Sequence, residues 1–139
     1  MEINERFFKR SNWLNNYLGI YNIKMSEEEK LSIQAFVIPV TPFQQNCSIL
    51  WCTETKLGAV IDPGGDIDQI LYAINKYDVK IEKILITHAH LDHAGATAEL
   101  SRQLDVPIEG PHKDDMFLIE SLEEQGKKYN FSPAESFQT

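Results

Sequence analysis

Four side chains that can bind a metal ion fall within six residues of this chain. They are His88, His90, Asp92 and His93, and the apolar segment 81–87 before them is typical of a short buried strand. Residues two apart on extended backbone point the same way, so His88 and His90 can direct two imidazoles at one ion. Asp92 and His93 follow where the chain begins to turn, and they can address a second ion beside the first.

Two metal ions held in this way have a defined chemistry. Imidazole and carboxylate donors suit Zn²⁺, with Fe and Mn as alternatives. Ions roughly 3.5–4 Å apart lower the pKa of a bound water and polarise an acyl carbonyl, which is the chemistry of hydrolysis. Three of the four histidines of the chain lie in this segment, which makes a chance cluster of surface histidines a poor alternative. We therefore expect a two-metal hydrolytic site.

The residues around the cluster have simpler expected roles. Thr87 can hydrogen-bond the loop backbone, and Gly95 would let the following helix begin close to the metal ions. His112 lies between a predicted strand and a predicted helix, where a surface or capping role is expected. Cys47 and Cys52 fall in one predicted strand on opposite faces. We expect no disulfide between them, and core packing rather than a nucleophilic role.

The pattern of apolar residues predicts an α/β fold. Strands are expected at 33–41, 46–52, 57–61, 81–87 and 106–109, and helices at 66–77, 94–104 and 114–125. The segment 46–61 is predicted to be a hairpin, Pro39 indicates an edge position, and Asp66 is a candidate N-cap. In such folds ligands bind at the carboxyl ends of the strands, which is where the histidine cluster lies.

Residues 87–95, THAHLDHAG, resemble the T-H-x-H-x-D-H-x-G signature of the metallo-β-lactamase superfamily. The segments IPV at 38–40, NC at 46–47 and VIDPGG at 60–65 are similar to its glyoxalase II-like branch, which includes hydroxyacylglutathione hydrolase. The resemblance covers about residues 33–139 but only the first half of the family fold. It implies the first half of an αββα sandwich, mainly one mixed sheet plus helices, truncated.

The resemblance also implies roles for the cluster. His88 and His90 would bind the first metal ion, and Asp92 and His93 the second. Asp92 would in addition be the catalytic residue beside the nucleophile that attacks a thioester carbonyl. The implied substrate is a small-molecule thioester such as S-acylglutathione.

Two further roles come from the resemblance alone. Asp62 would be a structural residue whose carboxylate braces the metal loop through hydrogen bonds. The first hairpin loop, residues 43–46, would border the mouth of the active site.

Alternatives arise because the family completes its site with a later histidine in a G-H-T segment, a bridging aspartate and a final histidine, which this sequence does not contain. Each metal would keep two protein ligands, where a catalytic zinc usually has three. We therefore expect weak metal binding and little hydrolysis by this chain alone. One face of the sheet would also be exposed as an apolar patch, which favours self-association. A catalytically inactive fragment and a non-catalytic interaction module are the alternatives to the hydrolase.

The charge balance argues against two classes of partner. The 139 residues include 13 Lys and Arg against 21 Asp and Glu, a net charge of −8. Nucleic-acid binding needs basic residues to neutralise phosphates, and anionic membranes also attract basic segments. No apolar run approaches the about 18 residues that span a bilayer. Without a disulfide framework, the cytoplasm is the expected compartment.

Residues 1–30 are expected to be an N-terminal extension, followed by a partial domain at 31–139. For residues 1–24 three interpretations stay open: an added helix, a disordered leader, or sequence upstream of a true start at Met25. The residues MSEEE from Met25 onward are typical of a cytosolic N-terminus, and exposed termini tolerate such additions.

Overall fold

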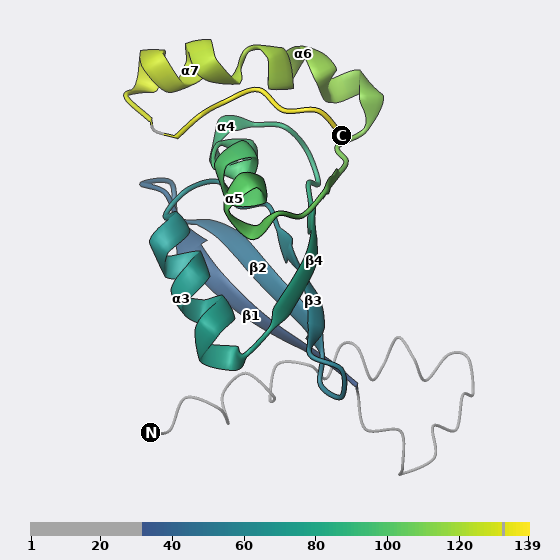
Figure 1. The fold of residues 1–139 in the computed structure, drawn as a ribbon. Helices are drawn as coiled ribbons and strands as arrows, with labels where there is room; N and C mark the ends of the chain where they lie inside the picture. The colour runs from purple at the N-terminus through teal and green to yellow at the C-terminus, as the bar shows by residue number, and fades with distance from the viewer. Residues whose placement is uncertain (1–31, 132) are drawn as a thin grey trace, which may run out of the picture. The chain divides into compact units, whose positions relative to one another are not determined.

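The computed structural model describes residues 32–131 and 133–139 (Figure 1). The chain divides into two units, Met1–Leu31 and Ser32–Thr139. The expected extension at residues 1–30, with its three interpretations, lies outside the described residues. Within the described part of the chain, no helix is both long enough and apolar enough to cross a membrane.

A five-stranded mixed sheet in the order β1-β2-β3-β4-β5 forms the centre of the described domain. The strands are β1 Ile33–Val40, β2 Gln45–Cys52, β3 Leu57–Ile61, β4 Lys80–Leu85 and β5 Ile108–Glu109. The first three strands are antiparallel, with β2 and β3 forming the predicted hairpin, and β4 and β5 run parallel to β3. Pro39 lies in the edge strand β1, where its missing N–H costs no ladder hydrogen bond. The predicted α/β class with one mixed sheet is confirmed.

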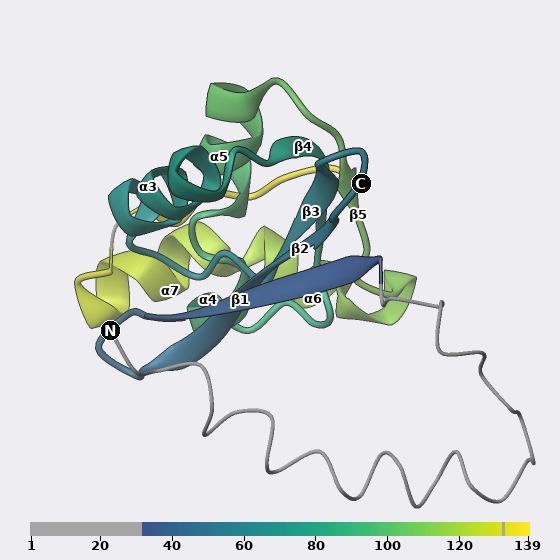
Figure 2. The same cartoon turned by 90° about the horizontal axis from the view of Figure 1, so that it is seen from below.

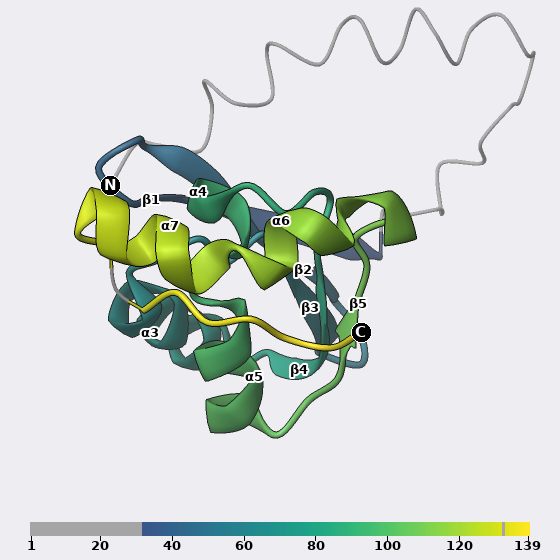
Figure 3. The ribbon, with the colours of Figure 1, turned by 90° about the horizontal axis from the view of Figure 1, so that it is seen from above.

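Helices pack on one side of this sheet and across its upper end. They are α3 Ile67–Tyr77, α4 Leu91–Ala94, α5 Thr97–Leu104, the 3₁₀ turn η2 Lys113–Asp115, α6 Met116–Glu120 and α7 Leu122–Tyr129. Helices α3 and α5 lie on the same side of the sheet (Figure 2). Helices α6 and α7 cross the upper end of the domain, where α7 contacts α4 (Figure 3).

Two predicted helices are interrupted. The predicted helix at 94–104 is broken between α4 and α5, because the backbone N–H of Ala96 donates to the carbonyl of Pro63 at 3.0 Å. A continuous helix would need that N–H to donate to the carbonyl of Asp92. The predicted helix at 114–125 forms as η2, α6 and α7 and continues four residues further, to Tyr129.

Two predicted strands are shorter than expected. The segment 81–87 leaves the sheet after β4, because the backbone N–H of Thr87 donates to the carboxylate of Asp62 instead of to a strand. The segment 106–109 contributes only the two residues of β5. Pro107 within it has no N–H to donate to a ladder.

The prediction that the side chain of Asp66 caps α3 is wrong. Asp66 precedes α3 with φ 52°, and its side chain makes no capping hydrogen bond to the helix. Its carboxylate instead accepts a hydrogen bond from the backbone N–H of Thr41 at 2.6 Å. Asp66 therefore ties the β1–β2 turn to the start of α3.

The two faces of the sheet differ in burial. The face toward the helices carries the core: Ile38, Val40, Cys47, Ile49, Trp51, Val60 and Ile84. On the opposite face Ile33 and Val37 of β1 are 65% and 44% exposed, and Leu50 and Ile61 are half-buried. The expected uncovered apolar face is thus present among the described residues, most openly on β1. Self-association through it stays a prediction.

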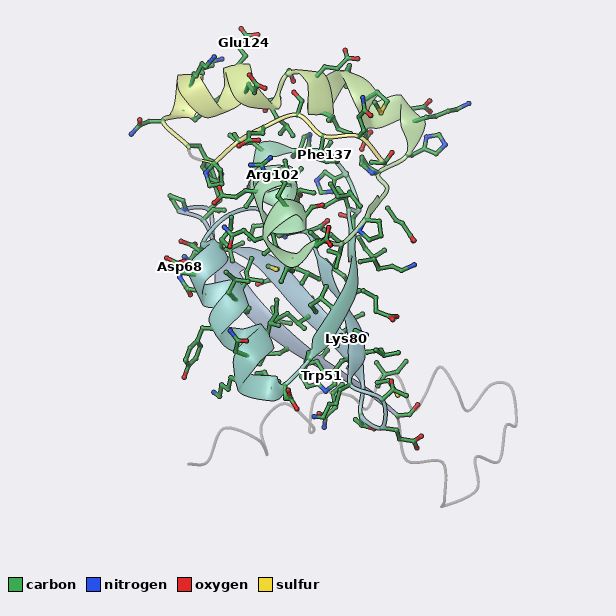
Figure 4. All side chains as sticks on the ribbon, viewed as in Figure 1. Trp51, Asp68, Lys80, Arg102, Glu124 and Phe137 are labelled. Atoms are coloured by element: carbon green, nitrogen blue, oxygen red, sulfur yellow. The ribbon has the colours of Figure 1, made fainter. Side chains whose placement is uncertain are left out.

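The C-terminal segment 133–139 returns beneath α6 and α7 (Figure 4). Arg102 of α5 donates two hydrogen bonds to the carboxylate of Glu135, at 2.7 and 3.0 Å. These bonds lower the pKa of Glu135 and raise the pKa of Arg102. Phe137 is buried in the core. The segment is therefore fixed to α5 and to the core, while Glu124 on α7 points away from the domain (Figure 4).

Candidate metal centre

The histidine cluster lies where two parallel strands end side by side. Ile61 at the end of β3 pairs with Leu85 at the end of β4. Because the strands run in the same direction, the residues that follow them meet at one edge of the sheet. Asp62 follows β3, and the metal loop, which we define as residues 87–93, follows β4. Its last three residues belong to α4, at the upper end of the sheet in Figure 1.

Asp62 contacts two residues of the metal loop through its carboxylate. It is only 5% exposed. Its Oδ1 accepts a hydrogen bond from the backbone N–H of Thr87 at 2.8 Å, and its Oδ2 accepts one from the Thr87 hydroxyl at 2.6 Å. The same Oδ2 lies 3.0 Å from Nδ1 of His93. A buried carboxylate needs such donors, so these contacts fix the loop relative to the end of β3.

The hydrogen bonds around Asp62 determine which ring nitrogen of two histidines carries the proton. The Thr87 hydroxyl has one proton, which it donates to Asp62, so it can only accept from Nδ1–H of His88 at 3.0 Å. Nδ1–H of His93 donates to Asp62 in the same way. In the neutral form of the two rings, Nε2 is then the nitrogen without a proton. This is the form in which an imidazole binds a metal, with its other nitrogen donating to a fixed acceptor.

The four residues predicted as ligands lie together. The ring centroid of His88 is 4.0 Å from that of His93 and 4.8 Å from that of His90. Oδ2 of Asp92 lies 3.6 Å from Nε2 of His93. His88, Asp92 and His93 are half-buried, and His90 is exposed. The loop therefore gathers three imidazoles and a carboxylate at one place on the surface.

One group of donors among the described residues could hold a metal ion, and it contains two of the four predicted ligands, His88 and His93, but neither His90 nor Asp92. Asp62, His88 and His93 each offer a ligand atom, and these atoms lie within 4.8 Å of one another, the one such group of three or more in the described part of the chain. Both oxygens of Asp62 already accept hydrogen bonds from Thr87. This favours bracing over direct coordination for Asp62. The pairing of His88 with His90 and of Asp92 with His93 on separate ions stays a prediction.

Glycine allows the segment after β3 to touch the metal loop. A Cβ on Gly64 would lie 1.6 Å from the backbone oxygen of Asp92, so no other residue fits there without displacing the loop. A Cβ on Gly95 would lie 2.8 Å from the backbone oxygen of Gly64. Gly95 was expected to open the helix after the loop, but it stands at the end of α4. Its missing side chain serves close packing between the two segments.

Gln45, the first residue of β2, was expected only as part of the loop 43–46 at the mouth of the site, without a contact to the predicted ligands. It is 9% exposed, and its Nε2 lies 3.2 Å from Nδ1 of His93 and donates to the carbonyl of Asn46 at 2.9 Å. Its buried Oε1 has no hydrogen-bond partner among the described residues. The available signal was the period of two along β2, which places Gln45 on the same buried face as Cys47.

Cys47 packs in the core as expected, whereas the same expectation is wrong for Cys52, which is half-buried outside the core. Cys47 and Cys52 are both free. Burial, and secondarily the charge of Asp62, raises the pKa of Cys47 to about 12, so its thiol is not a nucleophile near neutral pH. His112 is exposed, precedes η2 and accepts a hydrogen bond from the backbone N–H of Asp114 at 3.4 Å, which confirms the capping role.

Comparisons with known proteins agree on one family for this chain. Residues 40–138 match the family described as the metallo-beta-lactamase superfamily. The hydroxyacylglutathione hydrolase GloC of Haemophilus influenzae is 43% identical over 101 residues, 73% of this chain and 47% of that protein. A hydroxyacylglutathione hydrolase of Albidiferax ferrireducens is 30% identical over 80 residues, 58% of this chain and 31% of that protein.

Solved structures agree on the fold. TTHA1623, crystallised in a di-iron-bound form, superposes with a TM-score of 0.65 and 28% identity over 75% of this chain and 52% of its own. The chain spans about half the length of this structure and of the Haemophilus relative.

Proposed function

The chain belongs to the metallo-β-lactamase superfamily, and from this premise we propose that it serves as a metal-dependent hydrolase of thioesters of the S-acylglutathione type. Its fold is a partial metallo-β-lactamase fold. The observation that supports the proposal is the hydrogen-bond network on Asp62, which in neutral rings would leave Nε2 of His88 and of His93 without a proton. Relatives named hydroxyacylglutathione hydrolase support the thioester class.

The proposed ligands are His88 and His90 for one metal ion and Asp92 and His93 for the other. Zinc is the expected metal, with iron or manganese as alternatives, since imidazole and carboxylate accept all three. The di-iron form of TTHA1623 supports iron as an alternative. When bound, the ions would act as Lewis acids on water and on the thioester carbonyl.

The other residues have positioning roles in this proposal. Asp62 and Thr87 hold the rings of His88 and His93 with Nε2 free. Asp92 is the proposed catalytic residue, because its half-buried carboxylate lies against His93 and can take the proton of an attacking water at Oδ2. Gly95 allows the end of the loop to pack on the segment after β3. Two free cysteines fit a reducing compartment such as the cytoplasm.

The test combines metal content with hydrolysis of S-acylglutathione by the purified chain. We expect bound metal, turnover that chelation abolishes, and loss of both in His88→Ala. His112→Ala is the matched control, because His112 is an exposed histidine outside the cluster. Metal binding that survives in His88→Ala would contradict the proposed centre. Metal binding that depends on His88 without any turnover would favour the alternative of a catalytically inactive fragment.

A further inference from the structure

A pocket of about 240 Å³ opens beside the metal loop. Three elements line it: the β1–β2 turn with Phe43, the metal loop with His90, Leu91 and Asp92, and α7 with Gln125 and Tyr129. We call it the aromatic pocket. Because His90 and Asp92 are proposed metal ligands, a molecule in this pocket would contact the candidate metal centre directly.

Two exposed aromatic side chains gather at the aromatic pocket. Phe43 is 63% exposed and Tyr129 is 57% exposed, and neither belongs to the hydrophobic core. A single exposed aromatic residue needs no explanation. Phe43 and Tyr129, however, lie 86 positions apart in the sequence and line the same pocket as two proposed metal ligands. Such a pair of aromatic side chains suits the binding of an apolar ligand group.

The walls of the aromatic pocket are held in place. On one side, the N–H of Phe43 donates to the hydroxyl oxygen of Thr41 at 3.2 Å, and the N–H of Thr41 donates to Asp66 at 2.6 Å. On the other side, Nε2 of Gln125 donates to the hydroxyl oxygen of Ser121 at 2.7 Å. Helix α7 also contacts α4. These contacts fix the backbone of the β1–β2 turn and the side chain of Gln125 before a ligand binds.

Size and charge indicate which part of a thioester fits. The pocket is smaller than the roughly 300–1,000 Å³ that enclose a whole drug-sized ligand, so it suits one group of the substrate. No Lys or Arg lines it, and Asp92 contributes a carboxylate. The glutathione half of an S-acylglutathione carries two carboxylates, which would find no cationic partner among the lining residues, since Nζ of Lys128 lies outside the lining, 5.3 Å from the centroid of the Tyr129 ring. The acyl half carries none.

We propose that the aromatic pocket binds the acyl group of the thioester, and that Phe43 and Tyr129 determine which acyl groups are accepted. This inference rests on the proposed hydrolase function. It assigns an aromatic or bulky apolar acyl group as the preferred substrate. Phe43 and Tyr129 act here as specificity-determining residues, separate from the metal ligands.

The test compares S-acetylglutathione with S-phenylacetylglutathione in the whole chain and in Phe43→Ala and Tyr129→Ala. Both side chains are exposed, so both variants should fold, which their melting temperatures would verify. Phe117→Ala is the matched control, because Phe117 on α6 is 66% exposed and does not line the pocket. We expect kcat/KM for the phenylacetyl substrate to fall about tenfold in each pocket variant. The acetyl substrate and the control should change little.

A binding measurement separates this inference from the proposed function. Phenylacetamide, an uncharged analogue of the larger acyl group, is titrated into each protein and followed by NMR. We expect its affinity to fall about tenfold in Phe43→Ala and Tyr129→Ala, with shifts at Leu91 and Gln125. If the variants hydrolyse the acetyl substrate and their selectivity between the two substrates is unchanged, the inference about the pocket fails but the proposed function stands. Without any turnover the proposed function fails, and equal phenylacetamide binding in all four proteins would then overturn the pocket as well.

Discussion

Thr87 donates two hydrogen bonds to Asp62, one from its backbone N–H at 2.8 Å and one from its hydroxyl at 2.6 Å. The two residues come from the ends of adjacent parallel strands and are 25 positions apart. The same carboxylate lies 3.0 Å from Nδ1 of His93. One side chain from the end of β3 therefore sets both the path of the metal loop and the orientation of a proposed ligand.

Asp62→Asn should weaken both folding and metal binding. An asparagine has the same shape, but its amide nitrogen cannot accept a hydrogen bond and would face a donor. We expect the free energy of unfolding to fall by about 1–3 kcal/mol, and metal affinity to fall roughly 10–100-fold. Chemical denaturation and metal titration measure the two effects. Asp68→Asn, at an exposed position of α3 (Figure 4), should change neither, and an unchanged metal affinity in Asp62→Asn would contradict the bracing role.

Thr87→Val tests the hydroxyl that links His88 to Asp62. The variant keeps the backbone bond to Asp62 but removes the acceptor for Nδ1–H of His88. We expect roughly tenfold weaker metal binding and a larger fraction of His88 protonated on Nε2, read from ¹⁵N chemical shifts of the ring. Thr87→Ser should restore both values. If valine and serine behave alike, the hydroxyl does not set the tautomer.

Local sequence spacing was sufficient for the succession of strands and helices along the chain and for the placement of His88 and His90 side by side after β4. The orientation of His93 depends in addition on Asp62, 31 positions earlier in the chain. The break between α4 and α5 was not predictable in this way. It depends on Ala96 donating to Pro63, 33 positions earlier in the chain.

The roles of side chains that bond to distant residues also could not be predicted from the local sequence pattern. Asp66 has the position of an N-cap, but its carboxylate bonds to Thr41, 25 positions away. Gln45 belongs to the predicted loop 43–46, and its approach to His93, 48 positions away, could not be read from that local position. The local sequence pattern indicates which hydrogen bonds a residue can make. The tertiary structure determines which of these bonds it does make.

The two cysteines should differ in reactivity. Burial raises the pKa of Cys47 to about 12, whereas hydrogen bonds from Thr55 lower the pKa of Cys52 below its ordinary value. Because the thiolate is the reactive form, iodoacetamide near pH 8 should label Cys52 and not Cys47, as mass spectrometry would show. Cys52→Ala should abolish the labelling, and Cys47→Ala should leave it unchanged.

The same pKa shift predicts a pH dependence of stability. In the unfolded chain Cys47 loses its proton near its ordinary pKa of 9.0, whereas in the folded chain it keeps the proton until about pH 12. The unfolded state therefore binds fewer protons over this interval, and the free energy of unfolding should fall as the pH rises through it. Denaturation of the wild type and of Cys47→Ala above pH 9 gives the comparison, with a shallower slope expected in the variant.

The uncovered face of the sheet predicts self-association. Ile33 and Val37 are 65% and 44% exposed on the edge strand β1, and a second copy would bury them. Sedimentation velocity should show a sedimentation coefficient that rises with concentration, and Val37→Glu should remove the rise. Tyr72→Glu is the control, because Tyr72 is 68% exposed on α3. The association should persist in His88→Ala, and a wild type that stays monomeric would contradict it.

Gly64→Ala should destabilise the metal loop by steric overlap alone. The added Cβ would lie 1.6 Å from the backbone oxygen of Asp92, and backbone cannot rotate away as a side chain can. Overpacking of this kind typically costs about 1–3 kcal/mol in unfolding free energy. Displacement of Asp92 should weaken metal binding as well.

Gly65→Ala is the matched control for this substitution. Its Cβ would meet the side chain of Thr41 at 3.0 Å, a milder contact that does not involve the metal loop. We expect a smaller loss of stability and no loss of metal affinity, measured by denaturation and metal titration on the two variants side by side. Equal effects of the two alanines would mean that the fit of Gly64 against Asp92 does not hold the loop, because the loop would then accommodate the extra methyl by moving.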